Sequence, residues 1–206
     1  MSILDQSIVC NLTTPEKGLL SAVILAGGQG SRVGFQQKAL LAYQGQPLLV
    51  SVLARLKDQA SSLWVSIHTD PKLYLSYCSN LIADESSAFL GPLAGMQAAW
   101  HQLDSEWLLF VPCDNPCLPL DLVDRLIKAY DFNPSPLIVA FDGERIQPLY
   151  LLMHRSMVAS LDAVIAKSFL SVYRWIEESD YTTADFSDLP KQAFQNLNTL
   201  ELFETP

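Results

Sequence analysis

The stretch SAVILAGGQGSRVG, residues 21–34, joins a short apolar run to a glycine-rich loop. Residues 21–25 are aliphatic and partly β-branched, and they run directly into glycines, which is typical of a buried parallel strand. Ligands of parallel α/β sheets bind outside the carboxyl ends of the strands. We therefore expect the loop at 26–37 to form part of a binding site.

Strand-like and helix-like stretches alternate along the rest of the chain. Strands are predicted at 63–67, 81–83, 107–111, 137–141 and 147–153, with a turn at 142–144 between the last two. Helices are predicted at 47–57, 69–77, 96–103, 119–130, 155–165 and 172–178. This alternation predicts an α/β fold with a mostly parallel central sheet flanked by helices.

The composition excludes several classes of protein. Of the 206 residues, 50% are hydrophobic and 17% are charged, so the chain can bury a large core. The net charge of -9 argues against a nucleic-acid partner, because proteins that neutralise phosphate backbones are usually basic. No apolar run approaches the roughly 18 residues of a membrane span, and no secretory signal is recognisable. We expect a cytoplasmic protein with no membrane partner, whose four cysteines are free thiols rather than zinc ligands.

The glycine loop matches neither of two common phosphate-binding motifs. Gly28, Gly30 and Gly34 are spaced one residue too widely for a dinucleotide fingerprint, and no lysine directly follows the last glycine as a P-loop requires. Glycines nevertheless let backbone N–H groups approach phosphate oxygens closely. Arg32 and Lys38 add two cations to the same loop, so the segment is predicted to cradle phosphates.

Aspartates follow two of the predicted strands. Asp114 comes directly after the apolar strand at 107–111, where a carboxylate can hold Mg²⁺, a cation that prefers oxygen ligands and substrate phosphates. The alternative is a helix cap, but the next helix is expected only from Pro119. Asp84 ends a shorter strand and could equally be a turn residue. The segment GPLAG at 91–95 is predicted to be a turn that approaches a ligand, with a purely structural turn as the alternative.

Together these segments resemble the molybdenum cofactor guanylyltransferase family. The family pattern L-A-G-G-x-x-x-R-M-G, a following lysine, G-P-L-A-G and C-D-x-P is similar to residues 25–38, 91–95 and 113–116. Later stretches, DGER at 142–145 and NLNT at 196–199, also resemble it. The resemblance implies a Rossmann-like single nucleotidyltransferase domain, which we place at 21–206. The mixed residues 1–20 before it are expected to form an irregular leader that is flexible in part.

The resemblance also implies an activity and a set of site residues. GMP would pass from GTP to molybdopterin, with Mg²⁺ as cofactor, giving a guanine dinucleotide and pyrophosphate. The implied catalytic residues are Arg32, Lys38 and Asp114, with Asp114 as the metal ligand. The implied nucleotide-binding residues are Leu25, Ala26, Gly27, Gly28, Lys38, Ser66, Asp84 and Asp114.

The chain departs from the family pattern at several positions. Ser66 stands where the family usually has asparagine, and Gln37 precedes Lys38 where aspartate is common. Leu170 and Ser171 occupy the place of two arginines that the family often carries, which would otherwise meet the acceptor's phosphate. Lys167 or Arg174 could take over that contact.

Two alternatives remain open from the residues themselves. The first is a related nucleotidyltransferase that uses CTP or another acceptor. The second is a non-catalytic nucleotide-binding protein that delivers the cofactor, although the presence of Asp114 favours an enzyme. Expected partners are GTP and molybdopterin as substrates, together with molybdoenzymes or their chaperones that receive the product.

Overall fold

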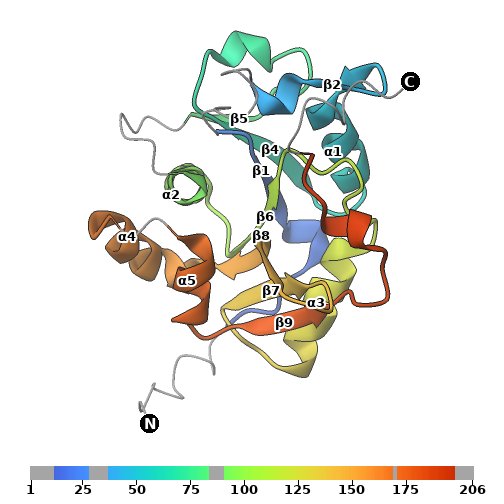
Figure 1. The fold of residues 1–206 in the computed structure, drawn as a ribbon. Helices are drawn as coiled ribbons and strands as arrows, with labels where there is room; N and C mark the ends of the chain where they lie inside the picture. The colour runs from blue at the N-terminus through green and yellow to red at the C-terminus, as the bar shows by residue number, and fades with distance from the viewer. Residues whose placement is uncertain (1–11, 28–36, 84–90, 169–170, 198–206) are drawn as a thin grey trace.

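The computed structural model describes residues 12–27, 37–83, 91–168 and 171–197. In this part of the chain a seven-stranded sheet has the order β5-β4-β1-β6-β8-β7-β9 and runs through the centre of the molecule (Figure 1). Its strands are β1 Ser21–Leu25, β4 Ser62–Ile67, β5 Leu81–Ala83, β6 Trp107–Pro112, β7 Leu137–Phe141, β8 Ile146–His154 and β9 Thr182–Asp185. A separate two-stranded hairpin pairs β2 Ala42–Tyr43 with β3 Gln46–Pro47.

Strand β1 lies between two parallel neighbours, β4 and β6. Its last residue, Leu25, is opposite Ser66 on one side and Pro112 on the other. The chain segments that follow these three positions therefore leave the sheet at the same edge. This register brings the start of the glycine loop close to Asp114, which lies two residues beyond the end of β6.

Strand β8 is the exception to the parallel arrangement. It pairs antiparallel with both β6 and β7, whereas β7 and β9 are parallel. A tight turn joins β7 to β8, and Gly143 in this turn has a φ of 95°, a left-handed conformation that favours glycine. The predicted α/β fold with a mostly parallel sheet is confirmed, and so is the turn at 142–144.

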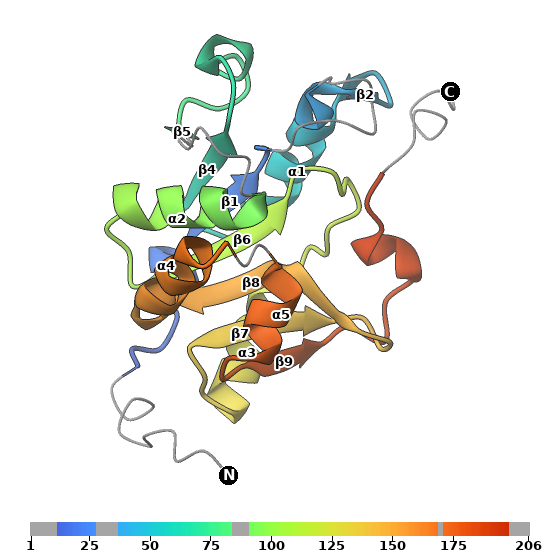
Figure 2. The same ribbon diagram turned by 60° about the vertical axis from the view of Figure 1, so that its left-hand side comes forward.

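Helices cover both faces of the sheet. α1 Leu48–Leu56 and α3 Leu122–Phe132 lie on one face, while α2 Pro92–Gln102, α4 Val158–Ala166 and α5 Val172–Glu177 lie on the other (Figures 1 and 2). Successive residues of β1 point to opposite faces, so Ile24 packs in the core beneath α1 and α3, whereas Val23 packs in the core beneath α2 and α5. The sheet is thus buried on both sides, which explains its continuous apolar strands.

Short 3-10 helices occupy several connections. They are η2 Lys17–Leu19, η4 Lys38–Leu40, η5 Pro71–Leu73, η6 Arg155–Met157 and η7 Lys191–Phe194. Residues 12–20 contact the sheet domain, because the carbonyl of Thr13 accepts a hydrogen bond of 2.7 Å from Trp107 Nε1. The division of the chain at residues 20 and 21 stays a prediction.

Three helix predictions need correction. The expected helix at 69–77 is only the 3-10 turn η5 followed by turns, because its apolar residues do not share one face: Tyr74 is buried, but Leu73 and Leu75 are exposed. The helix expected from residue 96 begins at Pro92, since proline is well suited to the first helical turn. The helix expected from Pro119 begins at Leu122.

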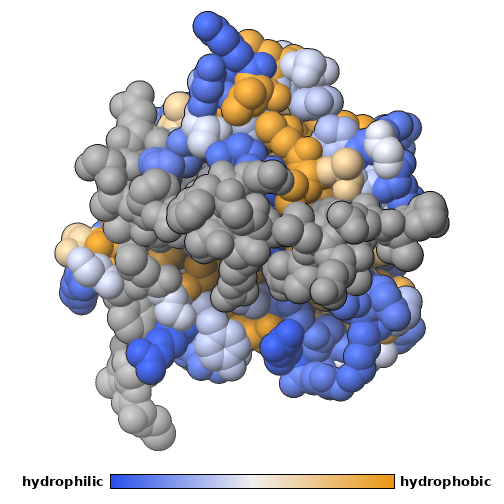
Figure 3. All heavy atoms as spheres, turned by 45° about the horizontal axis from the view of Figure 1, so that its top comes forward, coloured by the Kyte–Doolittle hydropathy of each residue, from blue (hydrophilic) through white to orange (hydrophobic). Residues whose placement is uncertain are grey.

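Strand β9 and the β2–β3 hairpin were not predicted. Both are short, and β9 alternates exposed and buried residues with little apolar content. Hydrophilic side chains cover most of the described surface in Figure 3, with apolar ones gathered in a smaller band between them. Within the described ranges, the helices are all too short or too polar to cross a membrane.

Candidate active site

A cavity opens at the edge of the sheet where β1, β4 and β6 end. One wall comes from the strand ends, and another from the first turn of α2. Its described lining residues are Leu25, Ala26, Gly27, Lys38, Ser66, Gly91, Pro92, Gly95, Pro112, Cys113, Asp114 and Leu149. Six of the eight positions expected in a nucleotide site therefore lie around one cavity.

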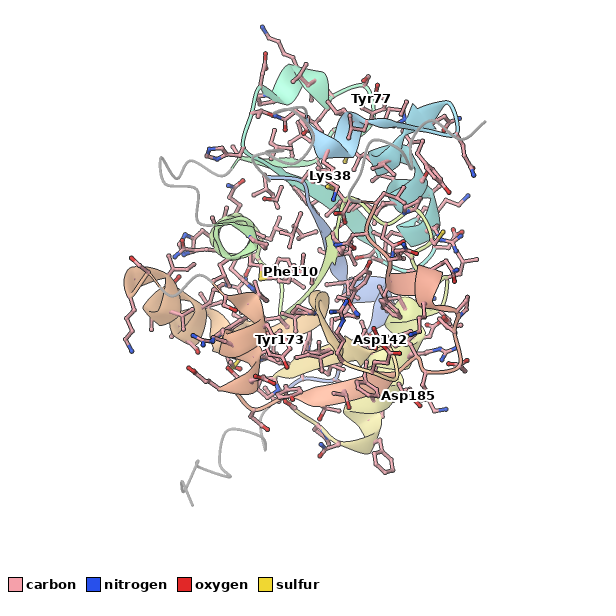
Figure 4. All side chains as sticks on the ribbon, in the orientation of Figure 1. Lys38, Tyr77, Phe110, Asp142, Tyr173 and Asp185 are labelled. Carbon is pink, nitrogen blue, oxygen red and sulfur yellow. The ribbon has the colours of Figure 1, made fainter. Side chains whose placement is uncertain are left out.

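The basic and acidic groups of this cavity contact each other directly. Lys38 Nζ lies 2.5 Å from Asp114 Oδ2, and the side chains are 22% and 11% exposed. The adjacent Ala39 is fully buried in the core and anchors η4, which holds Lys38 at the cavity. Figure 4 shows Lys38 beside the ends of the central strands, apart from Phe110 lower in the sheet. This pairing joins residues 76 positions apart, so no local sequence pattern predicts it.

The second oxygen of the Asp114 carboxylate is buried without a hydrogen-bond partner among the residues that the structure describes. A buried acceptor of this kind costs free energy unless it is satisfied. Sites that leave such an atom open are commonly completed by a ligand or an ion. Asp114 therefore gives one oxygen to Lys38, and its other oxygen is left for a ligand or an ion to satisfy.

Ser66 contributes a second unpartnered polar atom to the same cavity. Its Oγ is buried with no hydrogen-bond partner in the described part of the chain, although its backbone carbonyl accepts a 2.9 Å bond from the N–H of Ala26. A Cβ on Gly95 would lie 2.6 Å from Ser66 Oγ and 3.0 Å from a methyl of Leu25. Glycine at 95 thus permits α2 to approach the strand ends closely. The two glycines of GPLAG signalled such an approach, but the segment begins a helix rather than forming a turn.

The cysteine beside Asp114 is held neutral. Burial, and then the neighbouring Asp114 carboxylate, raise the pKa of the Cys113 thiol to about 12. A thiol with this pKa is protonated at neutral pH and is a poor nucleophile. Cys78, Cys113 and Cys117 are free thiols, as predicted.

The comparison with known proteins identifies the family. A model described as "MobA-like NTP transferase domain" matches residues 22–182, which is most of the chain. This chain belongs to that family. A relative from Shewanella putrefaciens, named molybdenum cofactor guanylyltransferase, is 40% identical over 88% of this chain and 93% of its own length. One from Photobacterium profundum carries the same name and is 40% identical over 91% of this chain and 95% of its own length. The family resemblance and the nucleotidyltransferase class are confirmed.

A solved structure supports the fold independently. The crystal structure of molybdopterin-guanine dinucleotide biosynthesis protein A from Archaeoglobus fulgidus aligns with a TM-score of 0.74. The alignment covers 89% of this chain and 94% of that one, at 19% sequence identity. At this identity the likeness establishes the Rossmann-like α/β fold alone.

The nucleotidyltransferase family generally uses a divalent metal, and the cavity suits one. Within the described ranges, no three histidine, cysteine or acidic side chains gather as a metal cluster. Mg²⁺, however, is usually held by one or two carboxylates together with substrate phosphates, and it retains several waters. The unpartnered Asp114 oxygen is a hard ligand in the right position, so the residues present fit such an ion.

Several residues inferred from the family pattern lie outside the described residues: Gly28, Arg32, Asp84 and Leu170. Their roles stay predictions. Ser171, at the place of a family arginine, is the N-cap of α5, and its hydroxyl accepts a hydrogen bond from the N–H of Arg174. Ser171 therefore caps a helix at a position where the resemblance implies an arginine.

Proposed function

We propose that this chain transfers GMP from GTP to molybdopterin, forming molybdopterin guanine dinucleotide and pyrophosphate. The relatives that share about 40% of its sequence are named for this activity. The single observation in this chain that best supports the proposal is the Lys38–Asp114 pair with its unpartnered carboxylate oxygen. A cation and a metal-ligating oxygen at one strand edge suit a triphosphate and its ion.

The proposed chemistry asks the protein for positioning and charge compensation. An oxygen of the acceptor's terminal phosphate would form a bond to the α-phosphorus of GTP, while the bond from that phosphorus to the β-phosphate oxygen breaks. The acceptor phosphate is already ionised, so no general base is needed. Phosphoryl transfers of this kind depend mainly on alignment and electrostatic stabilisation.

Each residue has a defined part in this scheme. Backbone N–H groups of Gly27 and Gly28, with Arg32, would bind the phosphates. Lys38 would move from Asp114 to the leaving pyrophosphate and stabilise its charge. Asp114 would hold Mg²⁺, which when bound neutralises phosphate charge and polarises the α-phosphorus. Cys113 is protonated and takes no part as a nucleophile.

The nucleoside would occupy the apolar part of the cavity. Leu25, Leu149 and Pro92 line it, and Ser66 Oγ provides a polar atom that a base or ribose could satisfy. Asp84 would add a further nucleotide contact. The proposal includes a cytoplasmic location and delivery of the product to molybdoenzymes or their chaperones.

The test is a direct assay of the purified chain with Mg²⁺ and molybdopterin. GTP and CTP are supplied in separate reactions, and pyrophosphate and dinucleotide products are measured. We expect pyrophosphate and a guanine dinucleotide with GTP only. Product from CTP alone would identify a cytidylyltransferase instead. Nucleotide binding without any pyrophosphate release would identify a non-catalytic carrier.

A further inference from the structure

Asn115, next to Asp114, is a fully buried amide whose hydrogen-bonding groups are all engaged. Its exposed fraction is 0%. Its Nδ2 group donates bonds of 2.6 Å to both Tyr150 Oη and the carbonyl of Ala193, and its Oδ1 accepts a 2.8 Å bond from the N–H of Cys117. A side-chain amide offers two donor hydrogens and one carbonyl oxygen, and each is used here.

The partners of Asn115 belong to three separate parts of the chain. Tyr150 is in the sheet strand β8, Cys117 follows in the same loop, and Ala193 is in η7 near the C-terminus. Phe194 then packs edge-on against Tyr150, with ring centroids 4.9 Å apart. The C-terminal segment 193–197 is thereby held against the loop that carries Asp114.

A further hydrogen bond reaches Asp114 itself. The N–H of Leu197 donates a 3.0 Å bond to the backbone carbonyl of Asp114. The backbone of Asp114 is therefore held by the C-terminal segment, while its side chain faces Lys38 and the cavity. Asn115 itself is not among the described residues that line the cavity.

We propose that Asn115 is a positioning residue, which ties the Asp114 loop to β8 and to the C-terminal segment 193–197 so that the Asp114 carboxylate is held ready for the metal. This inference rests on the proposed function only in naming the metal that Asp114 binds. Groups that orient a metal ligand commonly change metal affinity or activity by about 10- to 100-fold when they are removed. Asn115 thus affects the site through Asp114, without contacting the substrates.

Gln59 provides a matched control. It is also a buried amide, 2% exposed, and its Nε2 donates to the carbonyls of Arg55 and Pro119 while its Oε1 accepts from the N–H of Val123. Like Asn115, Gln59 therefore uses both side-chain donors and its side-chain acceptor. It holds the far end of the connection from Asp114 to α3. Loss of either amide removes three hydrogen bonds from the interior.

The experiment compares full-length Asn115→Ala and Gln59→Ala with the unchanged protein. Mn²⁺ affinity in the presence of GTP is measured from the free-ion electron paramagnetic resonance signal, and thermal unfolding is recorded in parallel. We expect both variants to melt at lower temperature, but only Asn115→Ala to weaken Mn²⁺ binding, by about 10- to 100-fold. Unchanged Mn²⁺ affinity in Asn115→Ala, or equal weakening in both variants, would overturn the proposal.

A second variant covers the case in which Asn115→Ala does not fold. Tyr150→Phe keeps the ring packing and removes one acceptor of the Asn115 amide. It should weaken Mn²⁺ binding by about three- to tenfold, and unchanged binding would count decisively against the positioning role. A protein that binds Mn²⁺ with GTP but makes no dinucleotide would disprove the proposed function and leave this inference standing.

Discussion

Two aspartates follow strands at the same edge of the sheet, yet their surroundings differ. Asp142, after β7, accepts 2.9 Å bonds from the N–H groups of Glu144 and Arg145 at one oxygen and a 2.6 Å bond from Gln147 at the other. Asp114, after β6, has Lys38 at one oxygen and, within the described ranges, no partner at the other. Figure 4 shows Lys38 and Asp142 in separate regions of the molecule. A satisfied carboxylate stabilises a turn, whereas an unsatisfied one is available to a ligand.

The energetic consequences of the two environments also differ. At Asp142, burial alone would raise the pKa, but the hydrogen bonds from Arg145, Glu144 and Gln147 outweigh it and lower the pKa below the usual aspartate value. Those bonds favour the charged form within the fold itself. At Asp114, the negative charge and the oxygen without a partner favour a bound metal ion. The neighbouring Lys38 and such an ion would in turn favour an anionic substrate. The carboxylate of the hairpin turn thus stabilises the fold, whereas the carboxylate in the cavity is left for the ligand that the proposed function requires.

The strongest test of this contrast is Asp114→Asn. Asparagine keeps the shape and an acceptor for Lys38, but it loses the negative charge that a metal needs. We expect a loss of transferase activity of about 100-fold or more, with little change in melting temperature. Asp142→Asn, assayed alongside, should retain nearly full activity. A fully active Asp114→Asn protein would remove the distinction between the two carboxylates.

The cation of the pair should matter less than the carboxylate. Lys38→Met keeps most of the side-chain volume and removes the charge. We expect kcat/KM for GTP to fall by about 10- to 100-fold, because the leaving pyrophosphate loses one stabilising contact. GTP affinity from calorimetry should weaken as well. An unchanged GTP affinity would show that Lys38 serves Asp114 alone.

The unpartnered hydroxyl of Ser66 can be probed through its neighbour. Gly95→Ala places a methyl group 2.6 Å from Ser66 Oγ and should weaken nucleotide binding by about tenfold, because the cavity wall must shift. Adding Ser66→Ala removes the closest of these atoms and should restore part of the affinity. If the double variant binds no better than Gly95→Ala, the clash lies with Leu25 rather than Ser66.

The smallest expected effect is on acid stability. Because the pKa of Asp142 is lowered in the folded state, its contribution is present above the unfolded aspartate pKa and is lost as the pH falls through the folded value. Asp142→Asn should therefore lower the free energy of unfolding by about 1 kcal/mol or less at neutral pH. Below about pH 4 the stability of this variant should fall less steeply than that of the unchanged protein. Denaturant unfolding at several pH values measures this. If the stability of Asp142→Asn and that of the unchanged protein depend on pH in the same way, the stabilising role of the Asp142 carboxylate is wrong.

Much of the fold could be predicted because its signals are local. The apolar runs at 21–25 and 107–111 identified the two central strands, and the DG pair at 142–143 identified the hairpin turn. Asp114 could be assigned because a carboxylate directly after a buried strand must lie at the ligand-binding edge. The helix predicted at 69–77 is wrong because the apolar residues of this segment are not confined to one face.

The sequence by itself determined the kind of fold, the family and the strand ends that line the cavity, since these follow from periodicity and from short motifs. Only the tertiary structure decided which groups meet there. The contact of Lys38 with Asp114 and the support of Asn115 by Ala193 join residues 76 and 78 positions apart. Such contacts depend on strand register and on helix packing across the sheet, which no local pattern contains. The open oxygen of Asp114 is likewise a property of the folded chain, because only its neighbours in space determine whether it is satisfied.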